Sequence, residues 1–94
     1  MPDVHETLKD RQGKYGEFAE NAKITQDLKD VMRAADNWSH GKMPPIQMEA
    51  LEVIAQKISR ILTGDPWYAD NWHDIAGYAL LVEKDLKDGS TDKG

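Results

Sequence analysis

The stretch from Pro45 to Pro66, PIQMEALEVIAQKISRILTGDP, decides the fold of this chain. A proline opens it, at a position where the missing N–H costs a helix nothing, and Gly64 followed by Pro66 ends it. Between these residues the apolar side chains recur at spacings of three and four, which predicts one long helix with a buried apolar stripe. The stripe consists of Leu51, Ile54, Ala55, Ile58, Ile61 and Leu62.

Two other segments show a helical period. The first runs from about Glu17 to Trp38, and Thr25 inside it can cap a new helix, so the segment forms either one helix or two. The second starts at Asp70 or Asn71, both good capping residues, and continues to about residue 87. Its expected buried face consists of Ile75, Ala76, Ala79, Leu80 and Val82.

The ends of the chain differ from its middle. A short helix is expected over residues 4–12, whereas residues 88–94 are too polar to bury enough surface to stay ordered. No segment alternates between apolar and polar residues as a strand does. The sequence therefore predicts an all-α fold, a small bundle of three to four helices. One helical domain is expected over residues 1–87, with a flexible tail over residues 88–94.

Size and composition limit what the protein can be. A chain of 94 residues buries only about 60–65% of the surface that it exposes when unfolded, and this chain has no cysteine to staple it. We therefore expect a homo-oligomer. The net charge of −5 disfavours direct binding to nucleic acid, and no segment approaches the roughly 20 apolar residues of a membrane span. Because no apolar signal segment is found, a cytoplasmic location is expected.

Charged residues surround the predicted turn between the last two helices. Lys57 and Arg60 precede the turn, and two carboxylates, Asp70 and Asp74, follow it. If the two helices pack antiparallel, the carboxylates lie close to the cations. The cations then either form ion pairs that link the helices or bind a phosphate group, for which the Arg60 guanidinium offers a planar fork.

Aromatic residues lie in the same span. Trp72 and Tyr78 can stack on a nucleobase, and Trp67 can anchor a partner protein, although such residues more often pack in a core. Gly77, inside the last helix, costs about 1 kcal/mol relative to alanine and is expected to let another helix approach closely. The predicted ligand-binding residues are Lys57, Arg60, Trp72, Asp74 and Tyr78.

Some of the carboxylates are candidate magnesium ligands. Hard cations favour converging oxygen ligands, which carboxylates on facing helices can supply. Antiparallel packing places Asp74 nearer to Lys57 than to Glu49, so a second subunit or a strongly tilted crossing is needed to complete the site. Acids on a surface or at a helix start explain the same residues without a metal. The candidates are Glu49, Glu52, Asp70 and Asp74.

Three motifs resemble a known family. They are residues 11–22 (RQGKYGEFAENA), residues 57–62 (KISRIL) and residues 70–78 (DNWHDIAGY). Together they are similar to a family of small uncharacterised proteins of tailed phages and prophages, over about residues 5–86. The family has no established activity to carry over. Some of its members have a phosphofructokinase label, which does not suit a chain this short that lacks a nucleotide-binding βα unit.

A fainter resemblance is to the MazG-type all-α nucleoside triphosphate pyrophosphohydrolases. Those enzymes are oligomeric bundles that bind magnesium through a Glu-Glu-x-x-Glu helix and a Glu-x-x-Asp helix. Here the first motif reduces to Glu49 and Glu52 and the second to residues 71–74, which end in Asp74, so two of the expected acids are missing. The resemblance implies metal-assisted hydrolysis, which needs enough carboxylates to hold magnesium beside a triphosphate.

Three functions are consistent with these features. The leading hypothesis is a phage-derived helical oligomer that binds a phosphate-bearing small molecule such as a nucleotide. In it the cations meet the phosphate, Trp72 or Tyr78 flanks the base, and Asp74 holds magnesium or orients the cations. The alternative is a non-catalytic interaction protein that binds a host factor through its aromatic loop. The third is a MazG-like, magnesium-dependent nucleotide pyrophosphohydrolase.

Overall fold

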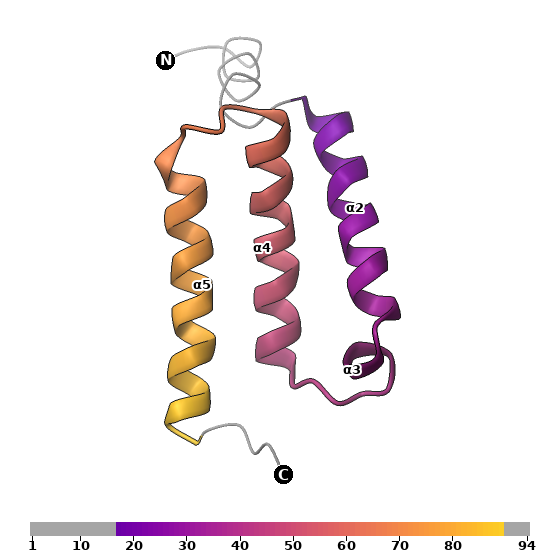
Figure 1. Cartoon of the computed structure of the whole chain (residues 1–94), viewed down its shortest axis with the longest axis vertical. Coiled ribbons are helices and arrows are strands. Elements are labelled where there is room, and N and C mark those ends of the chain that lie inside the picture. Colours follow the sequence, from indigo (N-terminus) through magenta and orange to yellow (C-terminus); the bar gives the residue numbers. More distant parts are fainter. Residues whose placement is uncertain (1–16, 90–94) are drawn as a thin grey trace, which may run out of the picture.

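The computed structural model describes residues 17–89. These residues contain no strand and form the helices α2 (Phe18–Ala34), α3 (Asp36–Ser39), α4 (Pro45–Thr63) and α5 (Ala69–Lys87) (Figure 1). The predicted all-α fold is confirmed for this part of the chain, where no helix has the length and apolar character to cross a bilayer. The helix expected over residues 4–12, and residues 90–94 of the expected tail, lie outside the described residues.

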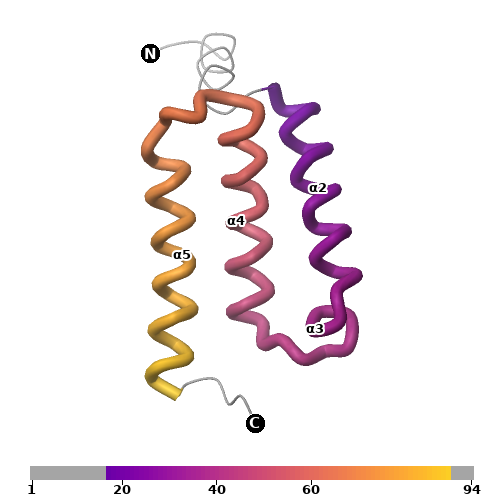
Figure 2. The backbone as a smooth tube through the Cα atoms, viewed as in Figure 1, coloured from indigo at the N-terminus to yellow at the C-terminus, as the bar shows by residue number. Residues whose placement is uncertain are grey.

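Helix α4 lies in the middle of a single layer, with α2 on one side and α5 on the other (Figure 1, Figure 2). Both neighbours run antiparallel to α4, and the main contacts join α4 to α5 and α2 to α4. The short helix α3 follows α2 at the end of the layer where the chain turns back into α4. The layer therefore has two broad faces, and none of the helices in residues 17–89 covers either of them.

Both ends of α4 agree with the sequence. Pro45 occupies the first turn, and Gly64 follows the last helical residue with φ −112° and ψ −137°, outside the helical region. The predicted start and stop signals of this helix are therefore confirmed.

The start of α5 differs from the prediction. The backbone N–H of Trp67 donates to Asp65 Oδ1 at 2.9 Å, and the N–H of Tyr68 donates to the Asp65 carbonyl at 3.2 Å. This turn, stabilised by the Asp65 side chain, brings the chain into helical geometry at Ala69, with Tyr68 as the N-cap. The prediction that Asp70 or Asn71 caps the helix is therefore wrong.

The first long segment is broken at a different residue from the one expected. Ala35, with φ −71° and ψ 154°, is extended and separates α2 from α3. Thr25 lies inside α2 and is buried, so the prediction that it caps a new helix is wrong. Its hydroxyl instead contacts the hydroxyl of Ser59 on α4.

A buried polar cluster joins α2 to α4. It consists of Asn21, Thr25 and Ser59, and the side chain of Ser59 is fully buried. Ser59 Oγ lies 2.6 Å from Thr25 Oγ1 and 2.9 Å from Asn21 Oδ1. Because buried hydroxyls and amides must find partners, this cluster fixes how α2 sits against α4 more strictly than apolar contacts would.

The apolar stripe of α4 is less buried than predicted. Among the apolar residues of the described chain, only Ala50 and Ala55 are buried, whereas Leu51 is 37% exposed and Leu62 is 64% exposed. The neighbouring helices explain the difference. Because α2 and α5 contact the two flanks of α4, the stripe between those flanks faces out of the layer.

The predicted buried face of α5 is also wrong in part. Leu80 is 62% exposed, and Ala76 and Ala79 are exposed as well. Only Ile75 and Val82 of that face are half-buried. An outer helix of a layer has one neighbour rather than two, so it buries a narrower strip than a helix inside a closed bundle does.

Candidate functional site

An ion pair joins α4 to α5 near the turn between them. Lys57 Nζ lies 2.9 Å from Asp74 Oδ2. The Lys57 side chain is only 14% exposed, and the Asp74 side chain is 41% exposed. The antiparallel arrangement of the two helices thus brings Lys57 and Asp74 together, as the sequence predicted.

The electrostatics of Asp74 involve more than one cation. The hydrogen bond from Lys57 is the largest cause that lowers the pKa of Asp74 below its ordinary value of 3.8. Partial desolvation opposes this shift, and the charges of Lys57, His73 and Arg60 add to it. Lys57 contacts Asp74 directly, and the charge of Arg60 acts on the same carboxylate; we call these three residues the charge cluster.

The lowered pKa of Asp74 predicts how stability depends on pH. The Asp74 carboxylate stabilises the folded state at neutral pH, and this contribution declines as the pH falls below 3.8 and through the lowered pKa of the folded state. We expect wild type to exceed Asp74→Asn in melting temperature at neutral pH, and the difference to shrink steadily as the pH falls below 3.8. Thermal unfolding followed by circular dichroism at a series of pH values measures it.

Asp30→Asn is the matched control for that series, because Asp30 is exposed on α2, the helix on the far side of α4. Its melting temperature should follow that of wild type at every pH. If the melting temperature of Asp74→Asn also equals that of wild type at every pH, the ion pair between Lys57 and Asp74 does not stabilise the fold.

A shallow depression lies beside Asp74 on α5. It measures about 320 Å³ and is lined by His73, Asp74, Gly77, Tyr78 and Leu81. A Cβ placed on Gly77 would meet no atom within 4 Å. The close helix contact expected at Gly77 is therefore absent between the described helices, and the missing side chain leaves the depression open.

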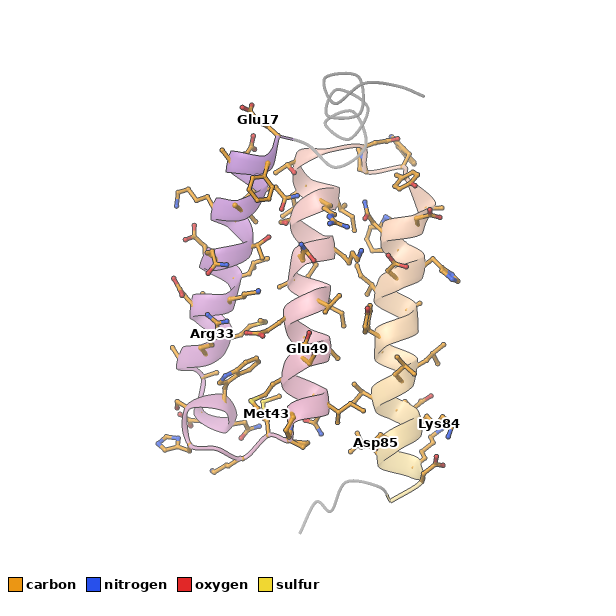
Figure 3. All side chains as sticks on the ribbon, turned by 180° about the vertical axis from the view of Figure 1, so that it is seen from behind. Glu17, Arg33, Met43, Glu49, Lys84 and Asp85 are labelled. Atoms are coloured by element: carbon orange, nitrogen blue, oxygen red, sulfur yellow. The ribbon has the colours of Figure 1, made fainter. Side chains whose placement is uncertain are left out.

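A second depression of about 380 Å³ continues along the groove between α4 and α5. Tyr78 and Leu81 line both depressions. Glu49 on α4, and Lys84 and Asp85 near the end of α5, lie at its far end (Figure 3). Together the two depressions form a trough with a polar end at Asp74 and an apolar middle at Tyr78 and Leu81; we call it the Asp74 trough.

Two of the predicted site residues lie elsewhere. Trp72 is 57% exposed, and its indole N–H donates to the Pro66 carbonyl at 3.3 Å, so it packs on the turn rather than in the trough. Asp70 Oδ2 accepts a hydrogen bond from the Tyr68 hydroxyl at 3.0 Å. The structure therefore brings together Lys57, Arg60, Asp74 and Tyr78, and not the two residues at the start of α5.

The four predicted magnesium ligands do not converge within one chain. Glu52 forms an ion pair with Arg33 of α2 (the latter labelled in Figure 3), and Asp74 is paired with Lys57. Across residues 17–89 no group of three or more histidine, aspartate or glutamate side chains is placed to hold a metal ion. A site that also uses Glu49 and Asp70, completed by a second subunit, stays a prediction.

Sequence reasoning missed one polar residue near the site. Asn71 is 1% exposed, and its Nδ2 has no hydrogen-bond partner among the described residues. It lies three residues before Asp74, one turn along the same side of α5. Its position at the helix start suggested a cap, and nothing in the sequence marks it as buried.

Comparisons of the chain with protein-family models, with curated proteins and with solved structures found no match. The resemblances to the phage family and to the MazG-type enzymes therefore stay predictions.

Proposed function

We propose that this protein binds a phosphate-bearing small molecule, such as a nucleotide, in the Asp74 trough. The observation that carries the proposal is the ion pair between Lys57 and Asp74. Asp74 forms the polar end of a trough whose middle is apolar, and Lys57 contacts its carboxylate at 2.9 Å. This combination of a few polar groups with apolar walls is typical of small-molecule sites.

The charge cluster supplies the phosphate end of the site. An ammonium group has three N–H donors, and a single carboxylate oxygen of Asp74 lies 2.9 Å from that of Lys57. Asp74 therefore orients Lys57 while leaving donor capacity for a phosphate oxygen. The nearby charge of Arg60, which already acts on Asp74, adds attraction for an anion.

The apolar middle of the trough supplies the surface for the rest of the ligand. Tyr78 is 36% exposed and Leu81 is 57% exposed, so both offer surface to a ring. The depressions of about 320 and 380 Å³ are each at the lower end of the range for small-molecule pockets, about 300–1,000 Å³. A nucleotide has both a phosphate and a flat ring, so it matches the polar end and the apolar middle of the trough.

A thermal-shift measurement tests the proposal. We expect inorganic pyrophosphate and nucleoside triphosphates, with and without magnesium, to raise the melting temperature of the full chain, and a nucleoside without phosphate to leave it unchanged. A ligand at 100 times its Kd stabilises the folded state by about 2.7 kcal/mol, which is readily measured. Lys57→Gln should abolish the response and Lys57→Arg should retain part of it, because the arginine keeps the charge.

Two further variants sharpen the test. Lys23→Gln removes an exposed lysine of α2 that pairs with Asp27, far from the trough, and it should leave the response intact. Gly77→Ala should raise the free energy of unfolding by about 1 kcal/mol and weaken the ligand response, because its methyl group enters the depression. The proposal fails if no phosphate compound shifts wild type, or if Lys57→Gln responds as wild type does.

A second function is favoured by a separate observation. Trp67, in the turn between α4 and α5, is 90% exposed. An exposed tryptophan is a common anchor of protein interfaces, so the alternative is a non-catalytic protein that grips a host factor through this turn. Trp67→Ser should then abolish capture of that factor and leave the phosphate response unchanged.

A further inference from the structure

An apolar surface crosses all three long elements of the layer. One groove lies against α2, α3 and α4, and another lies between α4 and α5, and Leu51 lines both. The apolar residues of the first groove are Met32, Ala35, Trp38, Met43 and Leu51. Those of the second are Ala50, Leu51, Ile54, Ala79, Val82 and Leu86.

Helical periodicity extends this surface along α4. Ile58, Ile61 and Leu62 follow Leu51 and Ile54 at steps of three and four, so they lie on the same side of the helix. Ile58 is 36% exposed and Leu62 is 64% exposed. The stripe that the sequence marks as a core is therefore the centre of an open surface, which we call the apolar face.

The apolar face and the Asp74 trough open on opposite sides of the layer, and Ala50 and Val82, between α4 and α5, line both. On α5 the apolar face includes Ala79 and Leu86, seven residues and two turns apart, and the trough includes Asp74 and Leu81, also seven apart. At 100° per residue these two pairs fall on opposite sides of the helix. The charged site and the apolar face thus lie on the two different faces of the layer.

We propose that a second copy of this chain covers the apolar face, so that two layers pack face to face. Helices α4 and α5 have 19 residues each, which at 1.5 Å per residue makes them about 28 Å long. Three helices spaced by about 9 Å give a face of similar width. The resulting area, on the order of 800 Å² per chain, is what a stable protein interface buries on each partner.

Charge and stability both favour a second copy over a different partner. Among residues 17–89, Asp36 is the one charged residue that lines either groove. Two such faces therefore meet without bringing many like charges together, although each chain carries a net charge of −5. The described part of a chain buries only Ala50 and Ala55 as apolar residues. Such a small core makes a lone chain only marginally stable. A second copy of the chain, unlike a different partner, is present whenever the chain is made, and its apolar face can enlarge this core.

Sedimentation equilibrium of the full chain tests this proposal. We expect wild type to have twice the chain mass of 10.6 kDa. Leu62→Lys should weaken the association by about tenfold or more, because it places a charge in the contact. Leu80→Lys is the matched control. Leu80 is 62% exposed, much like Leu62 at 64%. It lies two residues, about 200° around α5, from both Tyr78 and Val82, so it faces the outer edge of the layer and its replacement should not change the mass.

Other outcomes overturn the proposal. If wild type stays monomeric at about 100 μM, no second copy covers the apolar face, and its partner is then residues 1–16 or a different protein. A dimer that Leu80→Lys disrupts and Leu62→Lys does not would place the contact elsewhere. Leu51→Lys, at a residue that lines both grooves, must weaken the dimer as Leu62→Lys does, and circular dichroism confirms that each variant is helical.

Discussion

Replacing Ser59 by leucine is expected to lower the free energy of unfolding by about 3 kcal/mol. Ser59 is fully buried between α2 and α4, and its hydroxyl lies within hydrogen-bond distance of Thr25 and Asn21. The leucine removes the hydroxyl that Thr25 and Asn21 share, and forces a larger group into the same space. Urea denaturation at one fixed protein concentration measures the loss.

Gln56→Leu is the control for that variant. Gln56 lies three residues before Ser59 on the same helix and is exposed, so the same new side chain should change the free energy of unfolding by less than about 0.5 kcal/mol. If Ser59→Leu and Gln56→Leu unfold at the same urea concentration, the polar cluster does not hold α2 against α4.

Replacing Asn71 by leucine is expected to have the opposite sign, a gain of about 1–2 kcal/mol. Asn71 is 1% exposed, and its Nδ2 has no hydrogen-bond partner within residues 17–89. Burying a donor without a partner costs free energy, and an apolar side chain of similar shape removes that cost. The gain is measured by urea denaturation beside wild type.

Gln26→Leu controls for the gain in apolar surface. Gln26 is an exposed amide on α2, so its replacement should leave the stability close to that of wild type. A loss of stability in Asn71→Leu would show that the Asn71 amide has a partner in solution, such as a water molecule, and that it is a structural group.

The sequence predicts the helices better than it predicts their packing. Pro45 and Gly64 act through their own backbone chemistry, so the ends of α4 could be located from local signals. The start of α5 could not, because it depends on Asp65, a residue of the turn that bonds the following N–H groups. A helix can start either at a residue with a strong capping preference or after such a turn, and the sequence does not show which of the two starts is more stable.

The surface that the apolar stripe of α4 faces could not be predicted from the sequence either. A helical period shows which residues of α4 share a side, but it does not show what lies opposite them. Here α2 contacts α4 through Thr25 and Ser59, so a polar cluster occupies a flank where apolar contacts were expected. The stripe is left for the open face of the layer.

The candidate site was predicted in part for a similar reason. Lys57 and Asp74 could be paired in advance, because antiparallel helices joined by a short turn fix which residues meet. The partners of Glu52 and Trp72 depend on α2 and on the turn, respectively, and neither could be placed from spacing alone. Two of the four candidate metal ligands, Glu52 and Asp74, form ion pairs instead.

The two faces of the helical layer differ in chemistry, and one spectrum distinguishes them most directly. A methyl NMR spectrum of the full chain, recorded during a titration with inorganic pyrophosphate, reports on both faces at once. The Leu81 methyl groups, which line the Asp74 trough, should shift until the site is saturated, while those of Ile54 on the apolar face should not move. Leu81 methyl groups that never shift, or Ile54 methyl groups that shift equally, would contradict a phosphate site in the trough.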